Sequence, residues 1–502
     1  MRSRSFFISQ LGIITVKVLR NTNLNAAKPF CLSVLLICLA VPSSRCEHVP
    51  SDKEDANNRK VDDLVQAVMN KEHIPGLTLA VVKDGKLQKA QAYGLADVKS
   101  KIPTTTDTVF RIGSLSKQFV ATAIMMLVEE NKLSLDDPVS KYVNGTPGEW
   151  KRITIRHLLT HTSGIPDWLN ENIPVHTWRY GFDQRLLKAV ARRPLHFAPG
   201  DEWRYSNSNY HLLGMIIHKI TGQPYGDFLR ERIFQPLGMM QTAVSPMSGN
   251  VPGLAMGYDW NNNRLRPGYY VAPSVKAYAG GSLLSTILDM AKWDAALYTE
   301  KLLKQSSLQQ MWTPLRLNDG MTWRYGFGWH VGRINDHRIA EHVGNTLSGF
   351  SSLIYRAFDD RFTVIILDNR FNSDSAVGVL VNKISRLYLW EGPDYQPIPE
   401  KEPEITSRVR DIIDRRDRGQ LRAADFTPTT WAELSPWQKQ SQWDRATFGP
   451  ALSLVLVERA GEGGKRSYRY RVQYKFGTFL LHVVFDEQDK IAVWTTEDVE
   501  LN

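Results

Sequence analysis

The sequence predicts a mixed α/β domain built on an antiparallel sheet, followed by a smaller α+β domain. An apolar run over 77–82 reaches Asp84-Gly85, a turn that favours a β-hairpin, and the chain returns over 87–93. The run 363–367 is apolar and rich in β-branched residues, which indicates a central strand buried on both faces. Beyond a proline-rich stretch, apolar and polar residues alternate over 467–474, as in a half-buried strand.

Length and composition suit a large core plus a smaller module, because the chain has 502 residues and 42% of them are hydrophobic. We expect a targeting segment over 1–47, a main domain over 48–395, a linker over 396–407 and an accessory domain over 408–502. The accessory domain reads as a charged helix and about four strands. Its motifs indicate no chemistry, and its tryptophans, Trp431, Trp437 and Trp443, are interpreted as packing residues.

The first 47 residues have the composition of a targeting segment. Lys28 precedes an apolar run over 30–41, and small residues follow, as in a secretory signal. The run is short for a membrane span, although the segment leaves proximity to a membrane open. An acid-free, arginine-bearing start also fits an organellar transit peptide. Export, to the periplasm or the medium, is the first interpretation and an organelle the second.

Cysteine and charge exclude several kinds of function. All three cysteines lie in the first 46 residues, so the rest of the chain has no disulfide, thiolate ligand or cysteine nucleophile. The net charge is +10, but six basic residues and no acidic ones lie in that same segment. The remaining excess of positive charge is thinly spread, which argues against a nucleic-acid partner.

A Ser-x-x-Lys motif stands where the best-defined helix begins. Apolar residues recur at helical spacing after Ser114, so we expect a helix from there to about Asn131. Lys117 would then share a face with Ser114 and, with its pKa lowered by burial, could take the hydroxyl proton. The motif alone is weak, since a serine N-cap followed by a solvent-facing lysine has the same pattern.

Two further segments carry polar groups that suit acyl chemistry. A turn over 198–209 delivers Tyr205 and Asn207 before a helix expected near Tyr210. A tyrosine beside a lysine can act as a phenolate that takes and returns a proton, and an asparagine can bind a substrate amide. An ordinary turn with a capping asparagine is the alternative.

Two patterns of histidines could bind a metal ion or a substrate. His157 and His161 are four residues apart, but the glutamate of the zincin pattern is missing, so we expect structural histidines and no metal. The triplet His-Val-Gly occurs twice, at His330 and at His342, on the two strands of an expected hairpin over 325–344. A glycine at Gly344 would let a ligand lie close to that strand.

Taken together, these motifs resemble the serine β-lactamase and penicillin-binding-protein superfamily, in particular its class C-like branch. The resemblance covers roughly 61–390 and lies in the segments 110–119, 157–166, 199–213, 279–283 and 344–352. It selects His342 over His330 as the third motif. It implies a β-lactamase/transpeptidase-like fold, in which an antiparallel sheet is flanked by helices and an all-helical subdomain is added.

The resemblance also implies roles for the site residues. Ser114 would be acylated, Lys117 and Tyr205 would share the proton transfers, and Asn207 would hold the substrate amide. The backbone N–H groups of Ser114 and Asn345 would form the oxyanion hole. The acyl group would then be released by water, with no metal and no cofactor.

His342 departs from the lysine usual in β-lactamases of this branch. Histidine is mostly neutral at pH 7, so capture of a substrate carboxylate should be weaker. We therefore expect an esterase or peptidase for a small ester, amide or D-amino-acid peptide. A β-lactamase, a non-catalytic protein that binds cell-wall peptides and a partner-binding role for residues 404–502 remain alternatives. The sequence leaves the oligomeric state open.

Overall fold

The computed structural model describes residues 52–169, 182–246, 250–269, 278–334, 337–389, 396–435, 450–462, 465–474 and 477–498. The predicted targeting segment over 1–47 lies outside these residues. Among the described helices, none has both the length and the apolar character needed to cross a membrane.

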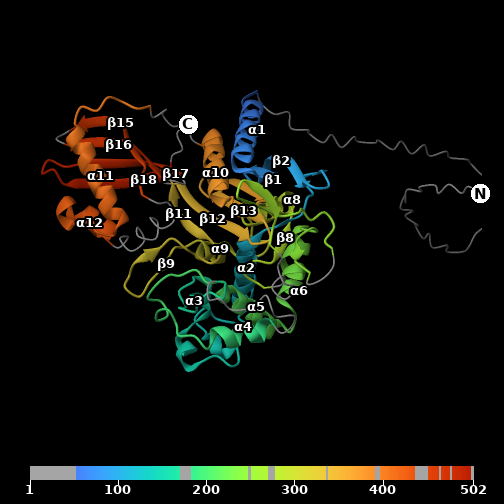
Figure 1. Ribbon diagram of the computed structural model, residues 1–502. Helices are drawn as coiled ribbons and strands as arrows, with labels where there is room; N and C mark the ends of the chain where they lie inside the picture. Colours follow the sequence, from blue (N-terminus) through green and yellow to red (C-terminus); the bar gives the residue numbers. More distant parts are fainter. Residues whose placement is uncertain are drawn as a thin grey trace, which may run out of the picture. The chain divides into compact units, whose positions relative to one another are not determined.

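A seven-stranded antiparallel sheet forms the centre of the main domain (Figure 1). Its order is β11-β12-β13-β14-β1-β2-β3, so the apolar run predicted to be central is β14, the fourth strand of seven. At the predicted hairpin turn, Asp84 and Gly85 both have positive φ, which suits the twist of the paired strands. The strands are β1 (Gly76–Lys83), β2 (Lys86–Asp97), β3 (Ile102–Pro103), β11 (His330–Ile334), β12 (His337–Thr346), β13 (Phe350–Ala357) and β14 (Phe362–Asp368).

Helices cover both faces of this sheet, which explains why its central strands are apolar throughout. On β1, Leu77, Leu79 and Val81 join the core formed with α1 (Asp52–Glu72) and α10 (Asp374–Leu389). The alternate residue Ala80 joins the larger core on the opposite face, where α8 packs on β1 and β14. The two-residue period of a strand thus divides its side chains between two cores.

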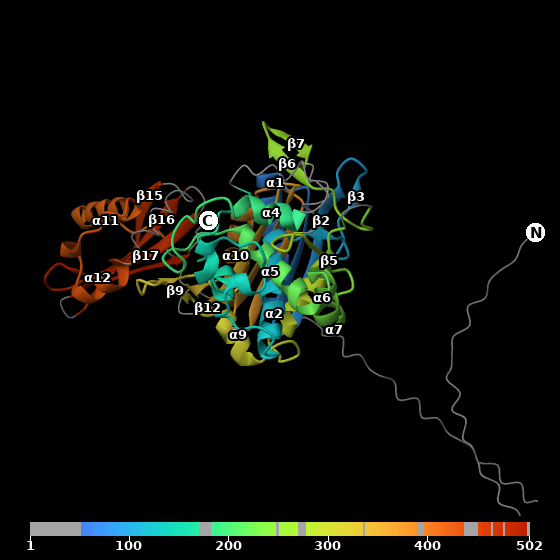
Figure 2. The ribbon, with the colours of Figure 1, turned by 90° about the horizontal axis from the view of Figure 1, so that it is seen from below.

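The larger core extends into a helical part, which Figure 2 shows from below around α2, α5 and α6. The buried helix α2 packs against both α5 and α6. The helices of this face are α2 (Ser116–Glu129), α3 (Ile155–Leu159), α4 (Phe182–Val190), α5 (Asn207–Thr221), α6 (Tyr225–Leu229), α7 (Gln235–Leu237), α8 (Ile287–Ala296) and α9 (Gln305–Met311).

Three small sheets complete the domain and connect its segments. The first has the order β4-β8-β5, and the other two are the pairs β9–β10 and β6–β7. Their strands are β4 (Phe110–Arg111), β5 (Ala243–Val244), β6 (Tyr258–Asn261), β7 (Arg264–Pro267), β8 (Leu283–Ser285), β9 (Leu315–Arg316) and β10 (Thr322–Trp323).

Three predicted boundaries were wrong by a few residues. The α-helix begins at Ser116, because Gly113–Leu115 form a 3-10 turn, η1, in front of it. Helix α5 begins at Asn207 and not near Tyr210, because a side chain from another segment binds its first free N–H group. The first strand of the hairpin predicted over 325–344 begins at His330.

The C-terminal region has its own sheet and core. The strands β15 (Ser453–Glu462), β16 (Lys465–Tyr474), β17 (Gly477–Phe485) and β18 (Ile491–Asp498) form an antiparallel sheet in that order. Its core also includes side chains of α11 (Pro403–Asp417), and Trp431 of α12 (Pro428–Leu434) packs against it. Trp437 and Trp443 lie outside the described residues.

Candidate active site

The hydroxyl of Ser114 is the point at which the predicted site residues meet. Lys117 Nζ lies 3.0 Å from Ser114 Oγ, and Tyr205 donates a hydrogen bond of 2.8 Å to the same oxygen. Lys117 is fully buried, whereas Ser114 and Tyr205 are partly exposed. The hydroxyl-bearing residue Ser114 is therefore accessible to solvent, while the amine of Lys117 beside it is not.

Hydrogen bonds to the backbone hold the turn that carries Ser114. Ser116 Oγ donates to Gly113 O at 2.6 Å and accepts from Leu283 N at 3.1 Å. Ile112 N donates to Leu283 O at 3.0 Å, next to the pairing of β4 with β8. These bonds fix η1 against β8 and bring Gly280, just before β8, within reach of Lys117.

The surroundings of Lys117 favour its neutral form. Burial lowers the pKa of Lys117 to about 7, although the charge of Asp167 acts in the opposite direction. Its Nζ lies 2.6 Å from Gly280 O and 3.0 Å from Asn207 Oδ1. A neutral amine has two N–H groups and one lone pair, and these two oxygens take both N–H groups. The lone pair is then left for the hydroxyl hydrogen of Ser114.

The environment of Tyr205 favours the protonated form of its phenol. The surrounding protein raises the pKa of its phenol well above the usual range, mainly by desolvation. The phenol therefore keeps its proton near neutral pH. This direction argues against the phenolate that the sequence suggested, and it leaves Lys117 as the group that can accept a proton.

Asp167 is a site residue that the sequence analysis missed. Its carboxylate accepts Asn207 N at 3.0 Å and Asn207 Nδ2 at 3.2 Å, so Asn207 Oδ1 points to Lys117. A carboxylate at the first N–H of α5 also suits the helix dipole. The signal was present in the sequence, since Asp167 directly follows the 157–166 segment, but its partner lies 40 residues away.

The edge of β12 lies directly against the turn that holds Ser114. Gly113 has φ +50, and a Cβ on it would lie 3.0 Å from Asn345 N. Ser352 Oγ, from the neighbouring strand β13, donates to Ile112 O at 2.9 Å. The backbone of Asn345 therefore flanks the turn that carries Ser114.

Comparison with known proteins shows the family of the chain. A sequence model of the family described as Beta-lactamase matches residues 61–382, more than half of the chain. The chain belongs to the β-lactamase family. The superfamily that its motifs predicted, which unites serine β-lactamases and penicillin-binding proteins, is thereby confirmed.

Penicillin-binding protein 4* of Bacillus subtilis (strain 168) is 33% identical over 334 residues, which cover 62% of this chain and 72% of that protein. The D-amino acid amidase of Ochrobactrum anthropi SV3, solved with D-phenylalanine, is 27% identical with a TM-score of 0.55 and covers 65% of this chain and 99% of that one. An octameric penicillin-binding protein homologue from Pyrococcus abyssi shares the fold, with a TM-score of 0.58, 22% identity and coverage of 88% and 96%.

Within this β-lactamase-family site, His342 is not placed as a free cationic group. The residue is 2% exposed, and its ring has Nε2 3.2 Å from Tyr325 OH and Nδ1 2.7 Å from Val343 O. Burial, helped by His330 and Lys117, lowers the pKa of His342 well below its usual range. His342 is therefore neutral at pH 7, and both ring nitrogens already have neighbours.

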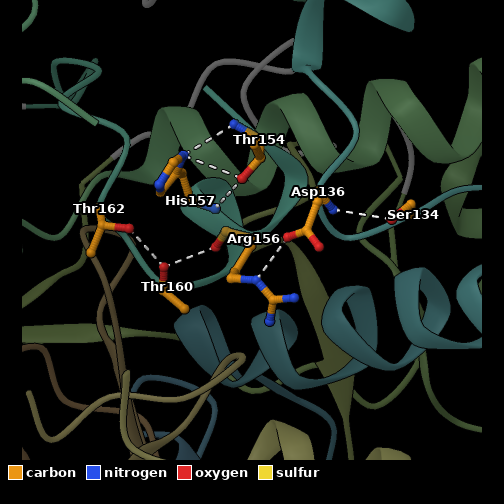
Figure 3. A network of polar contacts seen from close by, with 7 residues as sticks. All are labelled: Ser134, Asp136, Thr154, Arg156, His157, Thr160 and Thr162. Atoms are coloured by element: carbon orange, nitrogen blue, oxygen red, sulfur yellow. Dashed lines mark hydrogen bonds and ion pairs between the residues drawn. The ribbon is translucent and has the colours of Figure 1, made fainter. Parts of the chain in front are cut away.

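The structure also shows where His157 and His161 lie, two histidines whose sequence spacing is that of a zinc motif. Helix α3 ends at Leu159, so His157 and His161 do not share a helical face. Figure 3 shows His157 turned to Thr154, whose backbone N–H lies 3.1 Å from His157 Nδ1 in a capping box. Among the described residues, no group of histidine, cysteine and acidic side chains is arranged to hold a metal ion.

The two His-Val-Gly triplets allow a matched test of the β12 edge. A Cβ on Gly344 would lie 2.2 Å from Ile112 O and 2.4 Å from Ser352 Oγ, whereas on Gly332 its nearest neighbour is Arg324 Cδ at 3.9 Å. We expect Gly344→Ala to lower kcat/KM by about 10²-fold, because the added methyl group pushes β12 away from the turn that carries Ser114.

The control, Gly332→Ala, should leave kcat/KM within about twofold of wild type, because that position has room for a methyl group. Both variants are compared by steady-state kinetics on one ester substrate. Equal losses in the two variants would show that the close approach of Gly344 has no part in activity.

Proposed function

We propose that this protein is a serine hydrolase that forms an acyl-enzyme on Ser114 and acts on small esters, amides or D-amino-acid peptides. The observation that carries the proposal is the contact of Ser114 Oγ with both Lys117 Nζ and Tyr205 OH. One neighbour is a base at neutral pH and the other a proton donor, which is what acyl transfer requires.

The reaction would run in two steps. Ser114 Oγ attacks the carbonyl carbon while its proton passes to Lys117, and the oxygen that becomes negative is held by the N–H groups of Ser114 and Asn345. Tyr205 then donates a proton to the leaving amine or alcohol as the bond from carbon breaks. The proton held by Lys117 then returns to Tyr205. In the second step water attacks the acyl carbon and gives its proton to Lys117. The bond from that carbon to Ser114 Oγ breaks, Lys117 returns the proton to Ser114 Oγ, and the acid is released.

Because His342 is neutral, we expect substrates that have no carboxylate near this residue. A neutral, buried imidazole with both nitrogens engaged offers no fixed positive charge. An amide or ester leaving group needs none. The likeness to a D-amino acid amidase, at 27% identity, favours the same class of substrate. If the segment over 1–47 is an export signal, the substrate is met outside the cytoplasm.

A labelling experiment tests the nucleophile. A fluorophosphonate probe should label the full-length protein once, with the adduct on Ser114 and not on Ser116, whose hydroxyl is fully buried and bonded to Gly113. Ser114→Ala is the blank. Peptide mapping by mass spectrometry distinguishes the two serines. Binding of a D-alanyl peptide without any adduct or turnover would instead support a non-catalytic binding protein.

A substrate pair tests the leaving-group preference. We expect D-alanyl-D-alanine amide to be hydrolysed about 10-fold or more faster than D-alanyl-D-alanine, because a charged hydrogen bond to the free carboxylate, worth about 1.5–3 kcal/mol, is missing here. Nitrocefin is included in the panel as a β-lactam. Faster turnover of the free acid or of nitrocefin would favour a carboxypeptidase or a β-lactamase.

A further inference from the structure

Tyr205 is held on both sides by one residue of a distant loop. The backbone N–H before it, Arg204 N, donates to His161 O at 3.0 Å. The N–H after it, Ser206 N, donates to His161 Nδ1 at 3.2 Å. Two bonds to one residue therefore fix the main chain on either side of the tyrosine.

The imidazole of His161 also lies against the phenol ring itself. It is fully buried, and its centroid lies 4.4 Å from that of Tyr205 and 5.2 Å from that of Tyr210. Such ring contacts restrict the rotation of the Tyr205 side chain about its own bonds. The main chain beside Tyr205 and the ring of Tyr205 thus both contact the same residue, His161.

The hydrogen bonds define the tautomer of His161. A backbone N–H can only donate, so Nδ1 must accept from Ser206 and the ring hydrogen belongs on Nε2. Asn209 Nδ2 lies 3.2 Å from the same Nδ1, and Ser163 Oγ donates to Asn209 Oδ1 at 2.7 Å, which orients that amide. Protonation of Nδ1 would turn an acceptor into a donor that faces a donor.

The positive φ of His161 fits this arrangement. His161 has φ +60, an uncommon conformation for a residue with a side chain. It follows the end of α3, and it places the carbonyl and Nδ1 of one residue on both neighbours of Tyr205. Such an unusual backbone conformation persists where the surrounding contacts hold it, and here those contacts surround the proposed proton donor.

From these contacts we infer that His161 is the positioning residue for Tyr205, which holds its hydroxyl beside Ser114 Oγ for protonation of the leaving group. The inference rests on the proposed function. It gives the 157–166 segment a role in positioning Tyr205, which is separate from the proton transfer between Ser114 and Lys117. His161 itself touches neither substrate nor the reacting atoms.

The inference makes a prediction that a merely structural role would not make. An amine leaving group must be protonated, whereas p-nitrophenolate leaves without a proton. Displacement of Tyr205 should therefore lower kcat for an amide much more than kcat for the p-nitrophenyl ester of the same acyl group. The ratio of the two kcat values, amide over ester, is the readout, with KM nearly unchanged.

Two substitutions separate the role of Nδ1 from that of side-chain size. In His161→Asn the amide oxygen takes the place of Nδ1, and in His161→Gln it lies further out, near Nε2. We expect His161→Gln to lower the amide-to-ester ratio about 10-fold, as for the loss of one positioning hydrogen bond, and His161→Asn to keep it within about threefold. His157→Gln, at the capping histidine, is the matched control and should leave the ratio unchanged.

The outcomes are distinct. An unchanged ratio in His161→Gln, or an equal fall of amide and ester turnover in both His161 variants, would overturn the positioning role. Circular dichroism and the melting temperature of each variant report folding, and the Asn variant supplies the comparison if the Gln variant is unfolded. Wild type that neither turns over the ester nor takes the fluorophosphonate label would refute the proposed function and the inference together. Active wild type with an unchanged His161→Gln ratio would refute only the inference.

Discussion

Replacement of Lys117 by alanine is expected to lower kcat/KM by about 10³–10⁴-fold, close to the effect of Ser114→Ala, since the two groups act as a unit. The reason is that Lys117 is the neighbour of Ser114 Oγ that can accept a proton, because the pKa of Tyr205 lies too high. The double variant should be no slower than either single variant. Steady-state kinetics on one ester measures all three.

The dependence of kcat/KM on pH tests whether Lys117 acts as a base. The pKa of Lys117 is about 7, so the amine is protonated below that pH and free above it. In wild type, kcat/KM should therefore rise with pH through about 7 and level off above it. Lys117→Arg should be as slow as Lys117→Ala, because arginine keeps its proton. Lys132→Ala, at an exposed position just beyond α2, is the control. Substantial activity in Lys117→Arg would mean that Lys117 serves as a fixed charge and not as a base.

The largest effect on stability is expected at a buried ion pair that joins α8 to β13. Arg356 of β13 and Asp294 of α8 are both fully buried, and Arg356 Nε lies 2.6 Å from Asp294 Oδ1. Thr363 donates to the same oxygen at 2.8 Å. The rings of Tyr298 and Trp312 lie 4.6 and 5.1 Å from the guanidinium carbon. Each charge is therefore neutralised mainly by the other.

Arg356→Met should lower the free energy of unfolding by about 3–5 kcal/mol, because it leaves the carboxylate of Asp294 buried without its partner. Arg356→Met combined with Asp294→Leu should recover most of that loss, because no charge is then left unpaired. The surface pair Arg338–Asp359 is the matched control: there, Arg338→Met should cost less than about 1 kcal/mol. Urea denaturation measures all three variants. Equal losses at the two pairs would contradict the argument from burial.

Much of the local structure follows from the sequence because its cause is local. The apolar run over 363–367, rich in β-branched residues, predicts a strand buried on both faces, since successive side chains point to opposite faces and are apolar on both. The spacing of Ser114 and Lys117 places both on one helical face, because the α-helix repeats every 3.6 residues. The 3-10 turn shifted the helix start by two residues without separating the pair.

What the sequence could not supply are the partners that the fold brings from far along the chain. Tyr205 is 91 residues from Ser114, and the distance between them depends on how α5 packs against α2. Gly332 and Gly344 stand in identical triplets. The resemblance selects the second triplet, but only the packing of β12 on the turn at Gly113 shows that Gly344 has no room for a methyl group.

The sequence by itself determined the family of this protein, because the motifs of several segments together resemble it. It also determined the central strands and the pair of Ser114 with Lys117, because each of these depends on residues close together in the chain. The tertiary structure alone brings Tyr205 OH to 2.8 Å from Ser114 Oγ, Asp167 against the side-chain amide of Asn207 and His161 Nδ1 against the N–H that follows Tyr205. The physical reason is that hydrogen bonds act over about 3 Å of space, whatever number of residues lies between the partners.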